Sequence, residues 1–135
     1  MERLIADTGY FVAFARRSDP RHSGAAAFAD GFSGQLVTTS AVLVEACHFL
    51  SPDAQINLLN STGPRLAVID VPVPSYPDLA ATIGKYSDHE IDFADASLVW
   101  LAEKSGLRRI LTVDVSDFSA FRLGGGKRFD LVDWS

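Results

Sequence analysis

The sequence predicts an α/β protein: a three-layer α/β/α sandwich around a central, largely parallel sheet. Short apolar segments that fit strands alternate along the chain with longer segments that fit helices, and this alternation is typical of βαβ units. The first apolar segment, Arg3–Ala6, also lacks the polar residue at every second position that a half-exposed strand shows. We therefore expect helices to cover both faces of the sheet.

Five segments fit strands because they are short, apolar and rich in β-branched residues. The expected strands are residues 3–6, 35–38, 66–71, 109–113 and 129–132. Capping residues, prolines and glycines between them place the helices, and residues 10–15 fit a loop or a short helix. The other expected helices are residues 20–31 after an Asp19 cap, 41–50 after Thr39 or Ser40, 52–63, 77–86 and 92–105, the last ending at Gly106.

Size and composition predict one compact domain over residues 1–135. A chain of 135 residues with 47% hydrophobic and 21% charged residues is too apolar for a disordered protein and too short for two ordinary cores. The single cysteine, Cys47, cannot form an internal disulfide and suggests a reducing compartment. Glu2, Arg3 and Asp7 interrupt the N-terminal apolar segment, and no apolar run reaches the roughly 20 residues of a membrane span. We expect a soluble, cytoplasmic protein without a membrane segment.

The net charge of −5 by itself argues against a nucleic-acid partner, because such binding depends on neutralising phosphates. The average changes if four of the acids surround a cation, since the rest of the chain is then nearly balanced. Arg16, Arg17 and Arg21 would in that case be free to meet phosphates.

Four carboxylates lie where folding alone would not place them. Asp7 and Asp114 follow apolar strands, and the carboxyl ends of parallel strands line the ligand crevice of an open sheet. Glu45 interrupts a helix that is apolar nearly all round, and Asp95 falls on the apolar stripe of its helix, with Asp92 one turn earlier. A buried carboxylate costs several kcal/mol unless it is paired or binds a metal. We therefore expect these side chains to meet at one site.

Clustered carboxylates repel one another and are stabilised by a divalent cation among them. Oxygen ligands favour Mg²⁺ or Mn²⁺, and one cysteine with three scattered histidines offers no zinc site. Such an ion can activate a water and offset charge on a leaving oxygen, which phosphodiester hydrolysis requires.

Three segments of the chain resemble the PIN-domain ribonucleases, and among them the small toxins of the VapC type. In family order, the segments are LIADTGYFVAF, TTSAVLVEACHFL and DFADASLVWLAEKSGLRRILTVDVSDF. The likeness covers essentially the whole chain. A single DT or TxD pair would be a weak signal, whereas the ordered set with these intervals is fairly specific. The resemblance implies a PIN-like fold and Mg²⁺- or Mn²⁺-dependent endonucleolytic cleavage of RNA, held in check by a small antitoxin in the cleft.

The resemblance also assigns roles by position. The implied catalytic and metal-binding acids are Asp7, Glu45, Asp95 and Asp114, and the implied supporting residues are Thr8, Thr112, Asp92 and Asp117. The hydroxyls of the two threonines would support the acidic site. The apolar composition, with a mean hydropathy of +0.13, also favours a homodimer or a surface covered by an antitoxin helix.

Other interpretations of the acids exist. Asp7, Thr8 and Gly9 spell the DTG of aspartic proteases, but those need a β-rich chain and a second aspartate from a symmetric partner. An acidic-pocket receiver or phosphatase would need further acids beside Asp7, where Tyr10 and Phe11 follow instead. A non-catalytic RNA- or protein-binding domain stays possible, although the intact set of four acids counts against it. Metal-dependent RNA cleavage separates it from the nuclease.

Overall fold

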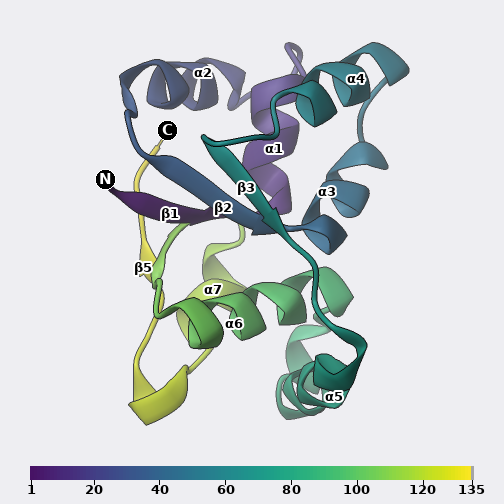
Figure 1. Ribbon diagram of the computed structural model, residues 1–135, viewed down its shortest axis with the longest axis vertical. Helices are drawn as coiled ribbons and strands as arrows, with labels where there is room; N and C mark the ends of the chain where they lie inside the picture. Colours follow the sequence, from purple (N-terminus) through teal and green to yellow (C-terminus); the bar gives the residue numbers. More distant parts are fainter. Residues whose placement is uncertain (135) are drawn as a thin grey trace.

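A five-stranded, entirely parallel sheet forms the centre of the computed structural model, which describes residues 1–134 (Figure 1). The strand order is β3-β2-β1-β4-β5, so β1 is the central strand. The strands are β1 (Arg3–Ala6), β2 (Gln35–Thr39), β3 (Leu66–Ile69), β4 (Arg109–Leu111) and β5 (Asp130–Leu131). The parallel pairing confirms the predicted sheet.

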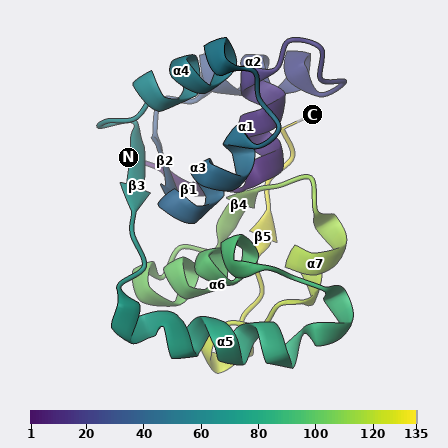
Figure 2. The ribbon, with the colours of Figure 1, turned by 90° about the vertical axis from the view of Figure 1, so that its right-hand side faces the viewer.

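Helices cover both faces of this sheet, as Figures 1 and 2 show. One layer contains α1 (Thr8–Ala15), α2 (His22–Gly31), α3 (Ser40–Cys47) and α4 (Pro52–Asn60). The other contains α5 (Tyr76–Lys85), α6 (Phe93–Ser105) and α7 (Val115–Ala120). Short 3-10 helices are η1 (Val73–Ser75), η2 (Ser87–His89) and η3 (Gly124–Gly126). The three layers confirm the predicted sandwich. No helix within residues 1–134 has the length and apolarity needed to cross a bilayer.

Strands β1 and β4 are buried because both of their faces pack against helices. Leu4 and Ile5 of β1 and Ile110 and Leu111 of β4 are at most 1% exposed, which explains their continuous apolar sequence. The chain runs from β1 outward through β2 to β3, and β4 and β5 then add on the other side of β1. The strand order therefore reverses between β1 and β4, and a ligand crevice is expected at their carboxyl ends.

The C-terminal segment braces the end of β4. The Trp134 indole N–H donates to the Thr112 carbonyl oxygen at 3.2 Å, and its ring lies edge-on to Tyr10 of α1 with centroids 5.1 Å apart. A buried indole N–H needs such a partner. The segment that follows β4 is thus held against α1 at the point where both face the crevice.

Some predicted details of the elements are wrong. The helix expected to begin at Pro20 begins at His22, because the Asp19 carboxylate accepts the backbone N–H of Arg21 in a local turn instead of capping the helix. The helix expected over residues 41–50 ends at Cys47, and it is not buried all round, since Val44 is 60% exposed. Helix α7 was not predicted, because its 6 residues are too few to show helical periodicity.

Candidate active site

A cavity of about 350 Å³ opens at the carboxyl ends of β1 and β4, where the strand order predicts a crevice. We call it the acidic pocket, because six carboxylates and one arginine are among its lining side chains. The charged lining residues are Asp7, Asp19, Glu45, Asp92, Asp95, Asp114 and Arg21. The structure therefore brings together the four acids that the sequence singled out as one site.

Asp7 lies at the base of the acidic pocket, between the end of β1 and the start of α1. Its side chain is 4% exposed and accepts two hydrogen bonds, from the Thr8 backbone N–H at 2.7 Å and from the Thr112 hydroxyl at 2.9 Å. Burial raises the pKa of Asp7 to about 6, the charges of Asp114 and Asp92 add to the rise, and the two hydrogen bonds oppose it. The ionised form of Asp7 is therefore disfavoured in the folded, metal-free protein.

Thr112 connects two of the acids. Its hydroxyl donates to Asp7 and accepts the backbone N–H of Asp114 at 2.9 Å. This double contact fixes the loop after β4 relative to Asp7, so Thr112 lies where a supporting residue is expected. Thr8 contacts Asp7 through its backbone N–H, whereas the sequence resemblance pointed to its hydroxyl.

Gly9 allows α1 to approach the same loop. A Cβ atom at Gly9 would lie 2.3 Å from Cγ2 of Val113, much closer than such atoms approach in proteins. The missing side chain lets the start of α1, and with it Asp7, lie directly against the segment that leads to Asp114.

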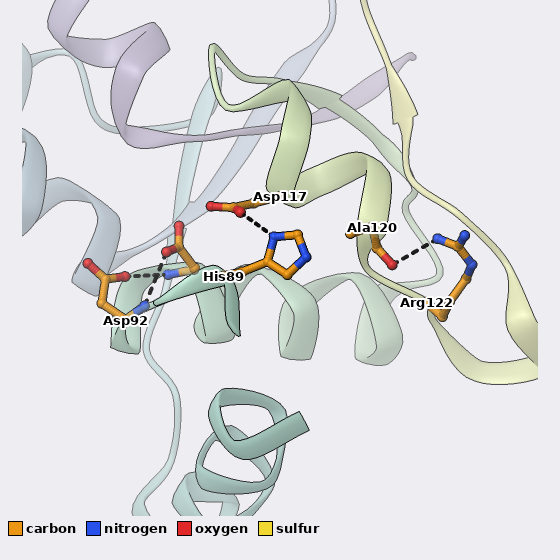
Figure 3. Close-up of polar contacts among 6 residues, drawn as sticks. His89, Asp92, Asp117, Ala120 and Arg122 are labelled. Carbon is orange, nitrogen blue, oxygen red and sulfur yellow. Dashed lines mark hydrogen bonds and ion pairs between the residues drawn. The ribbon is translucent and has the colours of Figure 1, made fainter. Parts of the chain in front are cut away.

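Asp92 and Asp95 form a capping box at the start of α6. The Asp92 carboxylate accepts the Asp95 N–H at 3.0 Å, and the Asp95 carboxylate accepts the Asp92 N–H at 3.2 Å (Figure 3). Burial is the main cause that raises the pKa of Asp95 to about 8, and the charges of Asp92 and Asp7 contribute. The capping box therefore fixes the Asp95 side chain on the pocket wall while the surroundings disfavour its charge.

Asp114 and Asp117 lie at the start of α7. The pKa of Asp114 is raised, first by burial and then by the adjacent Asp117 carboxyl, while His89 opposes the rise. Asp117 is not part of the pocket lining; it contacts His89 instead, with Nδ1 and Oδ1 2.7 Å apart (Figure 3). Arg122 secures the other end of α7 by donating to the Ala120 carbonyl at 2.8 Å. The His89 contact links α7 to the loop that precedes α6.

Glu45 reaches the acidic pocket from α3, and it is less buried than predicted. Its side chain is 35% exposed, because the neighbouring face of α3 is open to solvent. Glu45 contacts His48, with Nδ1 3.9 Å from Oε2. Within residues 1–134, none of Asp7, Glu45, Asp95 and Asp114 is ion-paired with a lysine or arginine. The structure therefore argues against the alternative in which each of these acids is neutralised by its own arginine.

Sequence reasoning missed three members of the pocket wall. Asp19 was assigned to a helix cap and Phe49 to a buried helix. Arg21 was expected, with Arg16 and Arg17, to be free to meet phosphates, but its place beside the acids was not predicted. All three lie in turns between helices, where no periodic pattern indicates which way a side chain points. Only the packing of α1, α2 and α3 brings these turns to the mouth of the pocket.

The donor set fits a divalent cation that prefers oxygen. The four acids surround one cavity, and burial and mutual repulsion raise the pKa values of three of them. A cation among them would relieve that repulsion. Across the described chain, no three acidic, histidine or cysteine side chains already form a compact ligand group. The carboxylates line the cavity rather than touch a common centre.

The pocket is at odds with an aspartic protease. Asp7 of the DTG sequence ends a strand of a parallel sheet that helices cover on both sides. Aspartic proteases instead need two such aspartates on a β-rich, symmetric scaffold.

The sequence of residues 4–122 matches the family model of the PIN domain. Ribonuclease VapC26 of Mycobacterium tuberculosis is 29% identical to this chain over 134 residues, which covers 96% of this chain and 99% of that protein. The crystal structure of Mycobacterium tuberculosis VapC20, described as a Sarcin-Ricin loop cleaving toxin, has a TM-score of 0.76 at 18% identity and covers 84% of this chain and 91% of its own. A toxin-antitoxin complex from Klebsiella pneumoniae has a TM-score of 0.65 at 15% identity over 98% of both chains.

The two solved structures share the fold, and the curated relative aligns along nearly the entire length. The residues matched by the family model run from β1 to the end of α7 and include every acid of the pocket. This chain belongs to the PIN domain family.

Proposed function

We propose that this protein is a metal-dependent endoribonuclease and the toxin of a toxin–antitoxin pair. The observation that carries the proposal is the convergence of Asp7, Glu45, Asp95 and Asp114 on one pocket without a lysine or arginine partner in the described chain. Membership of the PIN domain family and the relative named a ribonuclease support it. Carboxylates assembled at the cost of raised pKa values are more readily explained by a cation and a substrate than by folding.

The ion that suits this donor set is Mg²⁺ or Mn²⁺, because every candidate ligand is a carboxylate oxygen. Asp7, Glu45, Asp95 and Asp114 would hold it. When bound, such an ion supplies an activated water and offsets negative charge on the phosphate and the leaving oxygen.

The protein's own contribution is to orient the acids. The Thr112 hydroxyl and the Thr8 N–H each hold one oxygen of Asp7. Asp92 holds Asp95 through the capping box. These hydrogen bonds restrict the side chains of Asp7 and Asp95. Outer partners that fix ligands in this way commonly contribute roughly 10- to 100-fold to metal affinity.

The test measures cleavage of RNA by the purified protein with Mg²⁺ or Mn²⁺ and with a chelator. The wild type should cut only with the metal, and Asp7→Asn and Asp95→Asn should lose at least about a hundredfold in rate. Asp30→Asn is the matched control, because Asp30 is an exposed acid of α2 outside the pocket. Equal cleavage by all four proteins would point to a contaminant and would refute the assignment.

Metal binding can be measured without RNA. Calorimetric titration with Mn²⁺ should give heat for the wild type and for Asp30→Asn. The heat should be absent or strongly reduced for Asp7→Asn. Equal Mn²⁺ affinity in the wild type and Asp7→Asn would place the ion elsewhere.

We also propose a small antitoxin as protein partner, which the resemblance to VapC-type toxins implies; one of the proteins with this fold was solved as a toxin-antitoxin complex. Coexpression with an antitoxin encoded beside the gene should give a complex that no longer cuts RNA. Free toxin and a fully active mixture would contradict this.

A homodimer is proposed on the apolar surface beside the pocket. Val44, Tyr76 and Phe93 are 60%, 43% and 41% exposed, and the two aromatic rings contact edge-on at 5.3 Å. Exposed apolar side chains that gather in this way are typical of an interface. Light scattering after size exclusion should give a dimer for the wild type and a monomer for Val44→Asp. A monomeric wild type would refute the dimer.

A further inference from the structure

Phe49 separates the acidic pocket from a second cavity of about 560 Å³, and its side chain lines both. It lies in the turn between α3 and α4 and is 50% exposed, and it lines the acidic pocket together with Glu45. Arg17 is on the wall of the second cavity, and Arg21 is on the wall of the acidic pocket. An arginine thus lies on either side of an exposed ring.

The two arginines are free to bind a ligand. No hydrogen bond or ion pair involving the guanidinium of Arg17 or Arg21 occurs among the residues that the structure describes. Arg16 differs, since its guanidinium donates to the Phe49 carbonyl oxygen and so ties the end of α1 to the turn that carries the ring. Asp53 is the one acid on the wall of the second cavity, against two arginines.

This arrangement matches the chemistry of single-stranded RNA. Proteins bind unpaired RNA by stacking its bases on aromatic rings and by placing cations at its phosphates. A polyanion entering a pocket lined by six acids also needs cations close by, and Arg21 is the one that the pocket offers. The second cavity extends the same path beyond the ring.

We propose that Phe49, Arg17 and Arg21 form a binding track for single-stranded RNA that leads from the second cavity into the acidic pocket. A base flanking the scissile phosphate stacks on Phe49. Arg21 contacts a phosphate at the acidic pocket, and Arg17 contacts a phosphate on the other side of the ring. Arg16 is a positioning residue that holds the turn of Phe49. The proposal rests on the proposed RNA substrate. It adds that the RNA is single-stranded next to the scissile phosphate, and it names the residues that bind this stretch of RNA.

The first measurement is the binding of a short fluorescein-labelled oligouridylate by fluorescence anisotropy, with Asp95→Asn present in every protein to prevent cleavage. Phe49→Ala should weaken binding about tenfold, and Phe49→Leu should weaken it similarly because an apolar side chain without a ring cannot stack. Phe49→Tyr should bind like the parent. Binding that follows apolarity, with Leu as good as Phe, would overturn the stacking role.

The salt dependence tests the arginines. Arg17→Ala and Arg21→Ala should each reduce the slope of log K against log salt concentration by about 0.7, which is the contribution of one phosphate contact in a single strand. Arg128→Ala, which removes an exposed arginine outside both cavities, should leave the slope unchanged. Slopes equal to the parent's for both track variants would overturn the proposal.

Cleavage kinetics, with all six acids of the acidic pocket intact, separate the track from the proposed function. The Phe49→Ala and Arg17→Ala variants should raise KM more than they lower kcat. If the wild type cuts RNA and both variants have its KM, the track is wrong and the ribonuclease assignment stands. If the wild type cuts no RNA but the binding results hold, the track stands and the proposed activity fails. Circular dichroism should show native folding in every variant, because the substituted side chains are exposed or half-exposed.

Discussion

Replacing Asp7 by asparagine should stabilise the metal-free protein, and it should do so increasingly as the pH rises. The wild-type carboxyl has a pKa of about 6 in the folded protein against 3.8 as its ordinary value. A carboxyl whose pKa is higher in the folded than in the unfolded protein lowers the free energy of unfolding most at pH values where it is ionised in both states. The penalty is therefore small below the ordinary value, grows between the two pKa values, and is constant above about pH 7.

The size of the penalty follows from the two pKa values. A rise of about two units corresponds to about 3 kcal/mol of unfolding free energy lost by the wild type at about pH 8, and to about 0.5 kcal/mol at about pH 4. Asn avoids this penalty at both pH values. It also weakens the hydrogen bond from the Thr112 hydroxyl, which costs about 1 kcal/mol. The variant should thus be more stable than the wild type by about 2 kcal/mol at about pH 8 and equal or slightly less stable at about pH 4.

The assay is urea unfolding, followed by circular dichroism, with a chelator at both pH values. Asp30→Asn is the control, because this exposed acid should change the unfolding free energy little at either pH. The difference between the two pH values is the decisive quantity, since the loss of the hydrogen bond affects both. A stability change of Asp7→Asn that does not depend on pH would show that burial and repulsion do not act on this carboxyl as argued.

Further predictions concern packing and the orientation of the acids. Gly34→Ala should destabilise the fold by about 2 to 4 kcal/mol, because its Cβ would lie 2.1 Å from the backbone oxygen of Glu2. Gly84→Ala has no atom within 4 Å of the new Cβ and should raise the unfolding free energy by about 0.5 to 1 kcal/mol in the same urea titrations. Thr112→Val should weaken Mn²⁺ binding about 10- to 100-fold by releasing Asp7, whereas Thr112→Ser should bind like the wild type in calorimetry.

The fold was predictable because local sequence patterns indicate which strands are buried and where helices are capped. The continuous apolar runs of β1 and β4 indicate a sheet covered on both faces, and the structure has one. Local reasoning failed at Asp19, whose carboxylate bonds the backbone two residues on in a turn that resembles a helix cap in sequence. It also failed at Val44, because an apolar residue on a short helix is buried only if another element covers that face.

The candidate site divides in the same way. The position of Asp7 and Asp114 after two strands was enough to place them at one edge of the sheet. The hydrogen bond from Thr112 to Asp7 spans 105 residues of sequence, and the contact between His89 and Asp117 spans 28. Pairings over such separations depend on how whole elements pack, so no local pattern indicates them.

The linear order of residues by itself determined the α/β layering, the parallel sheet and the presence of acids that folding alone does not explain, because each of these follows from periodicity, caps and the cost of a buried charge. The tertiary structure alone decided which turns meet at the mouth of the pocket. It brought Phe49 and Arg21 beside the acids and left Val44 in solvent. Turns carry no periodic signal, and their side chains acquire neighbours only when the helices that they join have packed.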